Sequence, residues 1–193
     1  EVFNTISKEV KSEFAPDRRD KTFETKLKEV NGNWVLYGST TEADAKAALL
    51  EKLAAKNIDV LDSMKVLPDA ELVAQGKIYA VTAHSVANIR YEADYSSEMA
   101  TQVLMGTPLK VLEKKSYWYR VITPEGYIAW VTVGSVKTMN EEEFTAWRGS
   151  DRVIVDTHYT LVRDTPNAKG AIISDAVWGN IAQVSSRKVV NGY

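Results

Sequence analysis

Few side chains in this sequence could act as nucleophiles or general bases. The 193 residues include no cysteine and only two histidines, His84 and His158. Without cysteine, these residues can form no disulfide, thiolate metal site, redox motif or thiol nucleophile. Histidine is the usual general base near neutral pH, but no nucleophile motif accompanies either one. We therefore interpret both histidines as structural, and predict no catalytic residue, metal ligand or cofactor site in these residues.

Carboxylates are numerous, and a pair of them could act as the acid and base of a glycosidase. The most concentrated group, Glu141 to Glu143, falls in the first turn of a predicted helix. The helix dipole favours negative charge at that position without any catalytic role. The structural interpretation of this acidic group is therefore preferred.

Two tyrosines are the better candidates for contact with a ligand. Tyr91 and Tyr95 lie in a long loop after a short predicted strand, between charged and small residues. No strand periodicity requires their burial there. An exposed tyrosine can stack on a peptide or sugar and donate one hydrogen bond, so both are predicted substrate-binding residues. Trp118 and Trp130 fall on predicted strands and are expected to pack.

The composition restricts the possible partners. Apolar residues make up 45% of the chain and charged residues 26%, and the net charge is -2. This balance lacks the positive charge that nonspecific nucleic-acid binding needs, so no nucleic-acid partner is predicted. No apolar stretch approaches the roughly 18 residues of a membrane-spanning helix, so no membrane span is expected.

The first seventy residues predict an α+β unit in the order helix, strand, strand, helix, strand. Asn31-Gly32 suits a tight hairpin because such a turn needs two positive φ values. Gly38 is expected to end the second strand. Thr41 and Asp44 form a weak capping box for the second helix.

From residue 78 onward, short strands and turns predict a mainly β region with an internal repeat. At a constant offset of 73, Arg90 corresponds to Arg163 and Gly106 to Gly179. The first copy, residues 78–138, has five recognisable short strands, which suit a small barrel. A spacer helix over 139–150 follows, with Asn140 as its cap and Glu143 as the capping-box partner. Residues 151–193 match only the first part of the copy.

Four motifs of the first copy carry a resemblance to a known family. In chain order they are Val86-Ala-Asn-Ile-Arg90, Leu104-Met-Gly-Thr-Pro-Leu-Lys-Val-Leu112, Tyr117-Trp-Tyr-Arg-Val121 and Thr123-Pro-Glu-Gly-Tyr-Ile-Ala-Trp-Val131. This pattern resembles a bacterial SH3-like (SH3b) domain over a full unit. The second copy resembles the first half of another, although it lacks the Asn before Leu161-Val-Arg163. Residues 1–70 are more weakly similar to the BON module.

Tandem SH3b domains after a small α+β unit are similar to the front part of exported NlpC-type cysteine peptidases. Those enzymes cleave γ-D-glutamyl-L-diamino-acid bonds in murein peptides. The resemblance implies a non-catalytic portion that gates substrate and targets the cell wall, in the periplasm or cell envelope. It implies murein stem peptides as partners, and a catalytic domain with a Cys-His pair C-terminal to Tyr193. In that family the first SH3b domain helps close the substrate pocket near the free amino end of the peptide.

The alternative is a stand-alone extracytoplasmic SH3-like protein that binds peptidoglycan or a protein partner. Under either hypothesis the chain as given is expected to be catalytically silent. Because the second copy lacks the positions that complete the first barrel, Tyr193 is expected to be a break in a longer chain.

Overall fold

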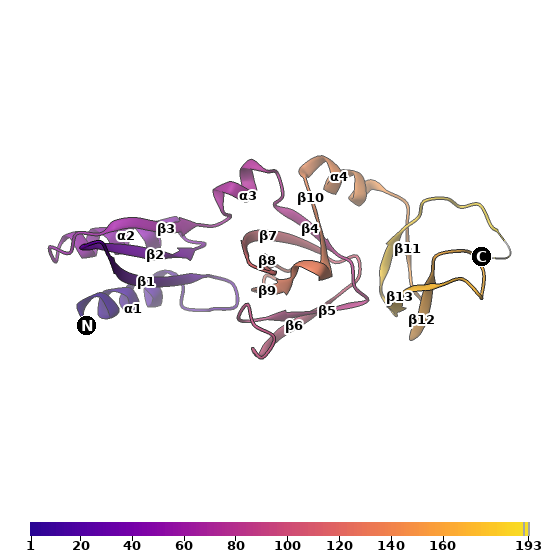
Figure 1. Cartoon of the computed structure of the whole chain (residues 1–193), viewed down its shortest axis with the longest axis horizontal. Helices are drawn as coiled ribbons and strands as arrows, with labels where there is room; N and C mark the ends of the chain where they lie inside the picture. The colour runs from indigo at the N-terminus through magenta and orange to yellow at the C-terminus, as the bar shows by residue number, and fades with distance from the viewer. Residues whose placement is uncertain (191, 193) are drawn as a thin grey trace. The chain divides into compact units, whose positions relative to one another are not determined.

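The computed structural model describes residues 1–190 and residue 192. The chain divides into two compact units, Glu1–Val73 and Ala74–Tyr193 (Figure 1). The first unit mixes helices and strands and the second is mainly β, as the sequence predicts. The motif comparison also sets Asn191-Gly192-Tyr193 against Ser116-Tyr117-Trp118 of the first copy, and of these positions 191 and 193 lie outside the described part of the chain.

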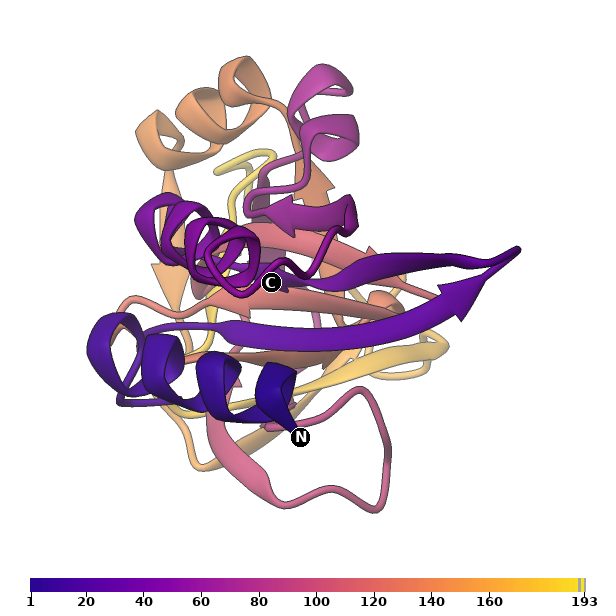
Figure 2. The same cartoon turned by 90° about the vertical axis from the view of Figure 1, so that its left-hand side faces the viewer.

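The first unit packs two helices against one face of a three-stranded sheet (Figure 2). In the sheet, β1 pairs antiparallel with β2, and β2 pairs parallel with β3. Ile6 and Val10 of the first helix and Leu49 and Leu53 of the second meet Leu36 of the sheet in one core. The elements, in the predicted order, are α1 (Val2–Phe14), β1 (Phe23–Val30), β2 (Asn33–Thr40), α2 (Ala43–Ala54) and β3 (Leu61–Val66), and a short helix α3 (Ala70–Ala74) follows.

The predicted hairpin forms, because Asn31 and Gly32 take φ values of 51° and 79°. The prediction for Gly38 is wrong: Gly38 does not end β2 but lies inside it, paired with Thr25 of β1. Its φ is +142°, and a Cβ atom there would lie 1.9 Å from the carbonyl oxygen of Glu24. The glycine therefore allows a close approach of the two strands.

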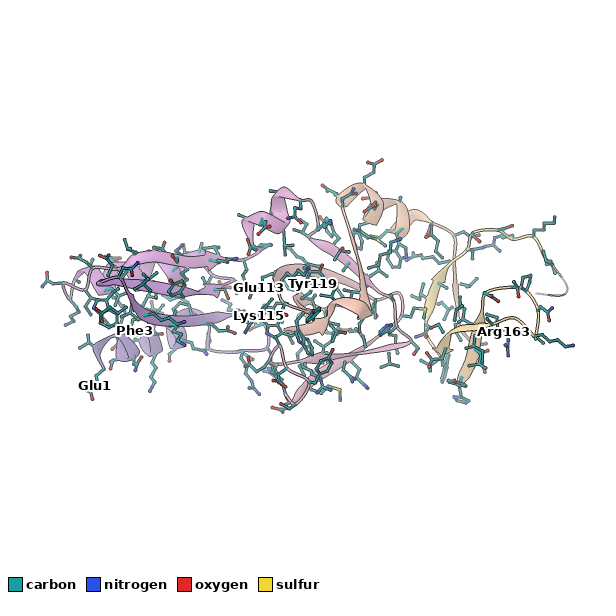
Figure 3. The ribbon with its side chains drawn as sticks, in the orientation of Figure 1. Glu1, Phe3, Glu113, Lys115, Tyr119 and Arg163 are labelled. Atoms are coloured by element: carbon teal, nitrogen blue, oxygen red, sulfur yellow. The ribbon has the colours of Figure 1, made fainter. Side chains whose placement is uncertain are left out.

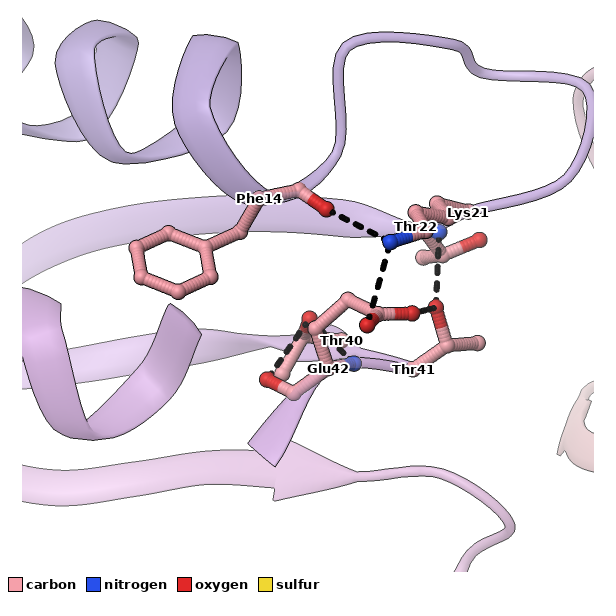
Figure 4. Close-up of polar contacts among 6 residues, drawn as sticks. All are labelled: Phe14, Lys21, Thr22, Thr40, Thr41 and Glu42. Atoms are coloured by element: carbon pink, nitrogen blue, oxygen red, sulfur yellow. Dashed lines mark hydrogen bonds and ion pairs between the residues drawn. The ribbon is translucent and has the colours of Figure 1, made fainter. Parts of the chain in front are cut away.

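The predicted capping box of α2 is also absent. The N-cap is Glu42, whose backbone N–H donates to Thr40 Oγ1 at 3.0 Å. Thr41 instead accepts a hydrogen bond from the backbone N–H of Thr22 at 3.0 Å. Lys21 Nζ bridges the carbonyl oxygen of Phe14 and the carboxylate of Glu42 (Figure 4). These contacts join the region after α1 to the start of α2, and they satisfy the backbone N–H of Glu42 and the carbonyl oxygen of Phe14 at the end of α1.

The second unit begins with a seven-stranded sheet in the order β10-β4-β7-β8-β9-β5-β6. The strands β4 and β10, at one edge, were not among the five predicted from sequence. The bounds are β4 (Tyr79–Thr82), β5 (Val86–Arg90), β6 (Met99–Leu104), β7 (Pro108–Lys115), β8 (Trp118–Ile122), β9 (Ile128–Thr132), the 3-10 turn η1 (Val133–Ser135) and β10 (Val136–Met139).

The helix α4 (Glu141–Gly149) starts as predicted. Asn140 accepts a hydrogen bond from the backbone N–H of Glu143 at 2.8 Å, and the Glu143 carboxylate accepts one from the Asn140 N–H at 2.9 Å. This reciprocal capping box fixes the helix start. Phe144 of the helix stacks on Tyr79 of β4, with ring centroids 4.7 Å apart.

The strands after α4 repeat the pairing of the earlier ones at the offset of 73. Tyr79 faces Lys110 between β4 and β7, and Arg152 faces Gln183 between β11 and β14. The hairpin β12–β13 likewise repeats β5–β6, and each has a register shift before its arginine. In the second copy this arginine is Arg163, which is labelled in Figure 3. The bounds are β11 (Arg152–Ile154), β12 (Tyr159–Arg163), β13 (Ile172–Val177) and β14 (Ile181–Gln183).

The second copy is attached to the first through the turns that precede β5 and β7. Asn180, which is 0% exposed, donates from Nδ2 to the carbonyl oxygen of Ser85 at 2.8 Å. The Ser85 hydroxyl donates to Asp175 at 2.8 Å, and the backbone N–H of Ile181 donates to the carbonyl oxygen of Met105 at 3.0 Å. The end of β13 and the turn after it are thereby hydrogen-bonded to two turns of the first copy.

Candidate functional site

The loop after β5, residues 91–98, is held in one shape by hydrogen bonds across its base; we call it the Tyr95 loop. Arg90 Nη1 donates to the carbonyl oxygen of Ser97 at 2.7 Å. The backbone N–H of Tyr91 donates to the carbonyl oxygen of Glu98 at 3.1 Å. Asp94 accepts from both the backbone N–H and the hydroxyl of Ser96, each at 2.7 Å. A loop closed in this way presents its tip with little ordering cost on binding.

The two predicted substrate-binding tyrosines have different surroundings. Tyr95 at the loop tip is 71% exposed, and its ring lies 4.9 Å from that of Trp118 at a tilt of 57°. Tyr91 at the loop base is half-buried and does not line the pocket beneath Tyr95. Trp118 and Trp130 are buried on their strands, in agreement with the packing role expected for them.

Tyr95 and Trp118 border a small pocket of about 170 Å³ that opens between β5, β8 and η1. Val86, Ala87 and five hydrogen-bonding side chains form the rest of its wall, and we call it the donor pocket. Its polar side chains are His84, Asn88, Arg90, Thr132 and Ser135.

Three of these side chains form a chain of hydrogen bonds. Ser135 Oγ lies 2.6 Å from Thr132 Oγ1 and 3.2 Å from His84 Nδ1. An imidazole carries at least one N–H and each hydroxyl carries one hydrogen, so the chain holds at least three polar hydrogens, and the two contacts use two of them. One hydrogen of the chain is therefore available to an acceptor outside it.

The other two polar residues also have donors to spare. The Asn88 oxygen accepts from Gln102 Nε2 at 2.9 Å, which leaves the Asn88 amide nitrogen as a donor. The guanidinium of Arg90 carries five N–H groups, and its bond to Ser97 uses one. No carboxylate lines the donor pocket among the described residues.

The Tyr95 loop itself is acidic. Glu92, Asp94 and Glu98 lie within it, and residues 91–98 contain no lysine or arginine. The hydrogen bonds from the Ser96 hydroxyl and then the Ser96 N–H hold the pKa of Asp94 below its ordinary value of 3.8. The loop tip is thus negatively charged at neutral pH, beside a pocket that offers donors.

The second copy has the same loop scaffold with a different tip. Arg163 Nη1 donates to the carbonyl oxygen of Gly170 at 2.6 Å, as Arg90 does to Ser97. Ala168 stands where the first copy has Tyr95. The second copy therefore keeps the arginine-held loop and a cavity beside it, but the exposed tyrosine belongs to the first copy alone.

Sequence analysis missed most of the donor pocket. His84 was interpreted as structural, and it does hydrogen-bond to Ser135, but it also lines the pocket. His158 lies elsewhere, with its ring edge-on to Trp178 at 5.9 Å. The pairing of Trp118 with Thr132 across β8 and β9 is the signal that could have placed both on one face.

The described residues contain neither a metal-binding cluster nor a membrane-spanning helix. They contain no group of three or more His, Asp or Glu side chains placed to hold a metal ion. None of their helices combines the length and apolar character that crossing a bilayer requires.

The comparison with protein families supports the resemblance of the first copy to a bacterial SH3 domain. The family described as "Bacterial SH3 domain" matches residues 85–137, which include the Tyr95 loop and most of the donor pocket. No curated protein matches the chain.

Three solved structures are similar to parts of the chain. An NlpC/P60 family protein from Bacillus cereus ATCC 10987 has 16% identity and a TM-score of 0.46, and the match covers 58% of this chain and 49% of that protein. A novel NlpC/P60 endopeptidase from Photobacterium damselae subsp. piscicida has 13% identity and a TM-score of 0.45, covering 56% and 27%. NlpC2 from Trichomonas vaginalis has 19% identity and a TM-score of 0.29, covering 31% and 23%. The chain thus spans less than half of each of these proteins, and its residues 85–137 are similar to bacterial SH3 domains.

Proposed function

We propose that this chain is a non-catalytic, substrate-gating and cell-wall-targeting portion of an exported murein-peptide cysteine endopeptidase. It would bind the stem peptide at the Tyr95 loop, and bond cleavage would belong to a catalytic domain C-terminal to these 193 residues. The bacterial SH3 match at 85–137 supports the cell-envelope part of this proposal. Two further parts of the proposal are that residues 151–193 are a second SH3b domain and that residues 1–70 are a BON-like unit.

The observation that carries the proposal is the exposed ring of Tyr95 at the tip of an acidic, hydrogen-bonded loop. A stem peptide with a free amino end carries an ammonium group. The carboxylates of the loop attract that group, and the tyrosine ring offers both a stacking face and a hydroxyl. Tyr91, at the loop base, is proposed to support this contact.

A binding measurement on the full chain tests this function. Wild-type protein is titrated with L-Ala-γ-D-Glu-diamino-acid tripeptide by calorimetry. We expect Tyr95→Ala to weaken binding by tenfold or more, a loss of about 1.4 kcal/mol, and N-acetylation of the peptide to weaken it similarly. Tyr117→Ala is the matched control, because Tyr117 is 77% exposed and lies outside the loop.

Two results would count against the proposal. Equal affinities of wild type and Tyr95→Ala, with both proteins folded by circular dichroism, would remove the loop from the binding site. Equal losses in Tyr95→Ala and Tyr117→Ala would show that the effect is not specific to the loop.

The stand-alone binding protein is the second candidate, and one observation favours it. All residues of the donor pocket lie between His84 and Ser135, so the pocket needs no other domain for its walls. Both candidates predict that this chain binds the tripeptide, so the sequence that follows residue 193 in the natural protein separates them. A nucleophilic cysteine with a histidine base in that sequence would favour the endopeptidase, and a natural protein without them would favour the stand-alone binding protein.

A further inference from the structure

The donor pocket has a chemical character opposite to that of the loop beside it. Its polar wall consists of an imidazole, two hydroxyls, an amide and a guanidinium, and no carboxylate lines it among the described residues. The amide and the guanidinium each retain a hydrogen that can be donated to a ligand, and the imidazole and the two hydroxyls share one. A pocket of about 170 Å³ has room for a carboxylate together with the carbon atoms that carry it. Its natural occupant is therefore a small anion that accepts several hydrogen bonds.

We propose that the donor pocket binds a carboxylate of the ligand, and specifically the free α-carboxylate of a γ-linked glutamate. This inference rests on the proposed function, which places a stem peptide at the Tyr95 loop. A glutamate linked through its γ-carboxyl keeps its α-carboxylate, so such a peptide carries an ammonium and a carboxylate close together. The acidic loop receives the first and the donor pocket receives the second.

The hydrogen-bond chain gives the pocket a means of selecting charge. When an anion enters, the hydroxyls of Thr132 and Ser135 can turn so that the imidazole of His84 keeps its outward N–H. A carboxamide in the same place presents an NH₂ group to a wall that is rich in donors. One polar contact is then left unsatisfied, which costs binding energy. The pocket should distinguish glutamate from isoglutamine at this position.

Asp94 in the acidic Tyr95 loop and Arg90 in the donor pocket are oppositely charged neighbours. The positive charge of Arg90 contributes to the lowered pKa of Asp94, so the two side chains interact electrostatically. Asp94 is held by two hydrogen bonds from Ser96 and does not line the pocket. A zwitterionic ligand matches this arrangement better than a purely cationic or purely anionic one.

The test compares L-Ala-γ-D-Glu with its α-carboxamide, L-Ala-γ-D-isoGln, by calorimetry on the full chain. We expect the carboxylate form to bind at least tenfold more tightly to the wild type. In His84→Ala the ratio of the two affinities should fall towards one, and Thr132→Val, which keeps the side-chain shape, should reduce it partly. His158→Ala is the matched control, because His158 lies outside the pocket, and it should keep the wild-type ratio.

The outcomes separate this inference from the proposed function. Equal affinity for the two dipeptides, with binding still lost in Tyr95→Ala, overturns the carboxylate site and leaves the function of the loop in place. A strong preference for the carboxylate that His84→Ala abolishes but Tyr95→Ala does not affect supports the pocket and overturns the role of the loop. If neither dipeptide binds at millimolar concentration, both proposals are wrong.

Discussion

At the scale of single residues, Asp94 and Tyr95 are neighbours with different constraints. Two hydrogen bonds from Ser96 fix the carboxylate of Asp94, whereas the ring of Tyr95 is free on one side and lies near Trp118 on the other. The fixed carboxylate positions charge, and the exposed ring offers contact area. Both residues lie in the turn of residues 94–97, which is closed by the hydrogen bond from the Ser97 N–H to the carbonyl oxygen of Asp94.

The lowered pKa of Asp94 leads to a prediction on pH. A carboxyl whose pKa is depressed in the folded protein stabilises the fold above its ordinary pKa, and this contribution is lost as pH falls through the lowered value. The Asp94 carboxylate should therefore remain ionised as pH falls through 3.8. In Ser96→Ala the hydroxyl bond is lost and the N–H bond remains, so the pKa of Asp94 should rise towards 3.8.

Carbon-13 NMR titration of the Asp94 carboxyl measures this change directly. Ser116→Ala, outside the loop, serves as the control and should leave the titration unchanged. An identical Asp94 titration in wild type and Ser96→Ala would show that the hydroxyl has no role in holding the charge.

At the scale of elements, the close approach of β1 and β2 depends on one glycine. Gly38 combines a positive φ with a backbone neighbour where a Cβ atom would lie. Its neighbours Tyr37 and Ser39 remain in register with β1. The strand continues to Thr40, whose hydroxyl accepts a hydrogen bond from the backbone N–H of Glu42 at the start of α2. Strand pairing and helix start are thus coupled through the end of β2.

Gly38→Ala should destabilise the first unit by about 3 kcal/mol or more, because the substitution adds backbone strain to a clash with a carbonyl oxygen. Amide hydrogen exchange of β1 and β2 measures the loss. Gly134→Ala is the control, since its Cβ would meet no atom within 4 Å and its φ is not positive; we expect a change within about 1 kcal/mol. Similar exchange rates in the two variants would contradict the role assigned to Gly38.

At the scale of the whole molecule, the second unit contains one strand-pairing pattern twice. The copies share register and loop scaffold, but only the first has the strands equivalent to β8 and β9 among the described residues. The hydrogen bonds from Asn180 and Ile181 join the second copy to turns of the first. Gly106 permits this contact, because a Cβ atom there would lie 2.6 Å from Ile181.

Asn180→Ala should therefore loosen the second copy without unfolding the first. The substitution leaves the backbone N–H of Val177 without the oxygen that now accepts its bond at 2.9 Å, at a cost of about 1–3 kcal/mol. We expect faster amide exchange in β11 to β14 and unchanged exchange in β5 to β9. Thr107→Ala, at the equivalent position of the first copy, is the control, and an equal effect of both substitutions would refute a specific role for Asn180.

The sequence by itself determined those features whose causes are local. The hairpin at Asn31-Gly32 follows from two residues that tolerate positive φ, and the start of α4 follows from Asn140 and Glu143. The 73-residue repeat is also visible along the chain, and the strands of the second copy pair in the register of their equivalents in the first. In the first two cases the interacting residues are close together in the sequence, and in the third the two copies can be compared directly in the sequence.

Tertiary structure decided the features that depend on segments far apart in sequence. Gly38 suggested a strand end, but the nearby Glu24 carbonyl explains why a glycine lies within the strand. His84 and Ser135 are 51 positions apart, and only the folding of the sheet brings them to one pocket. The exposed Tyr95 could be predicted because its loop is local, whereas the donor pocket beneath it could not, since strand order determines which side chains share a face.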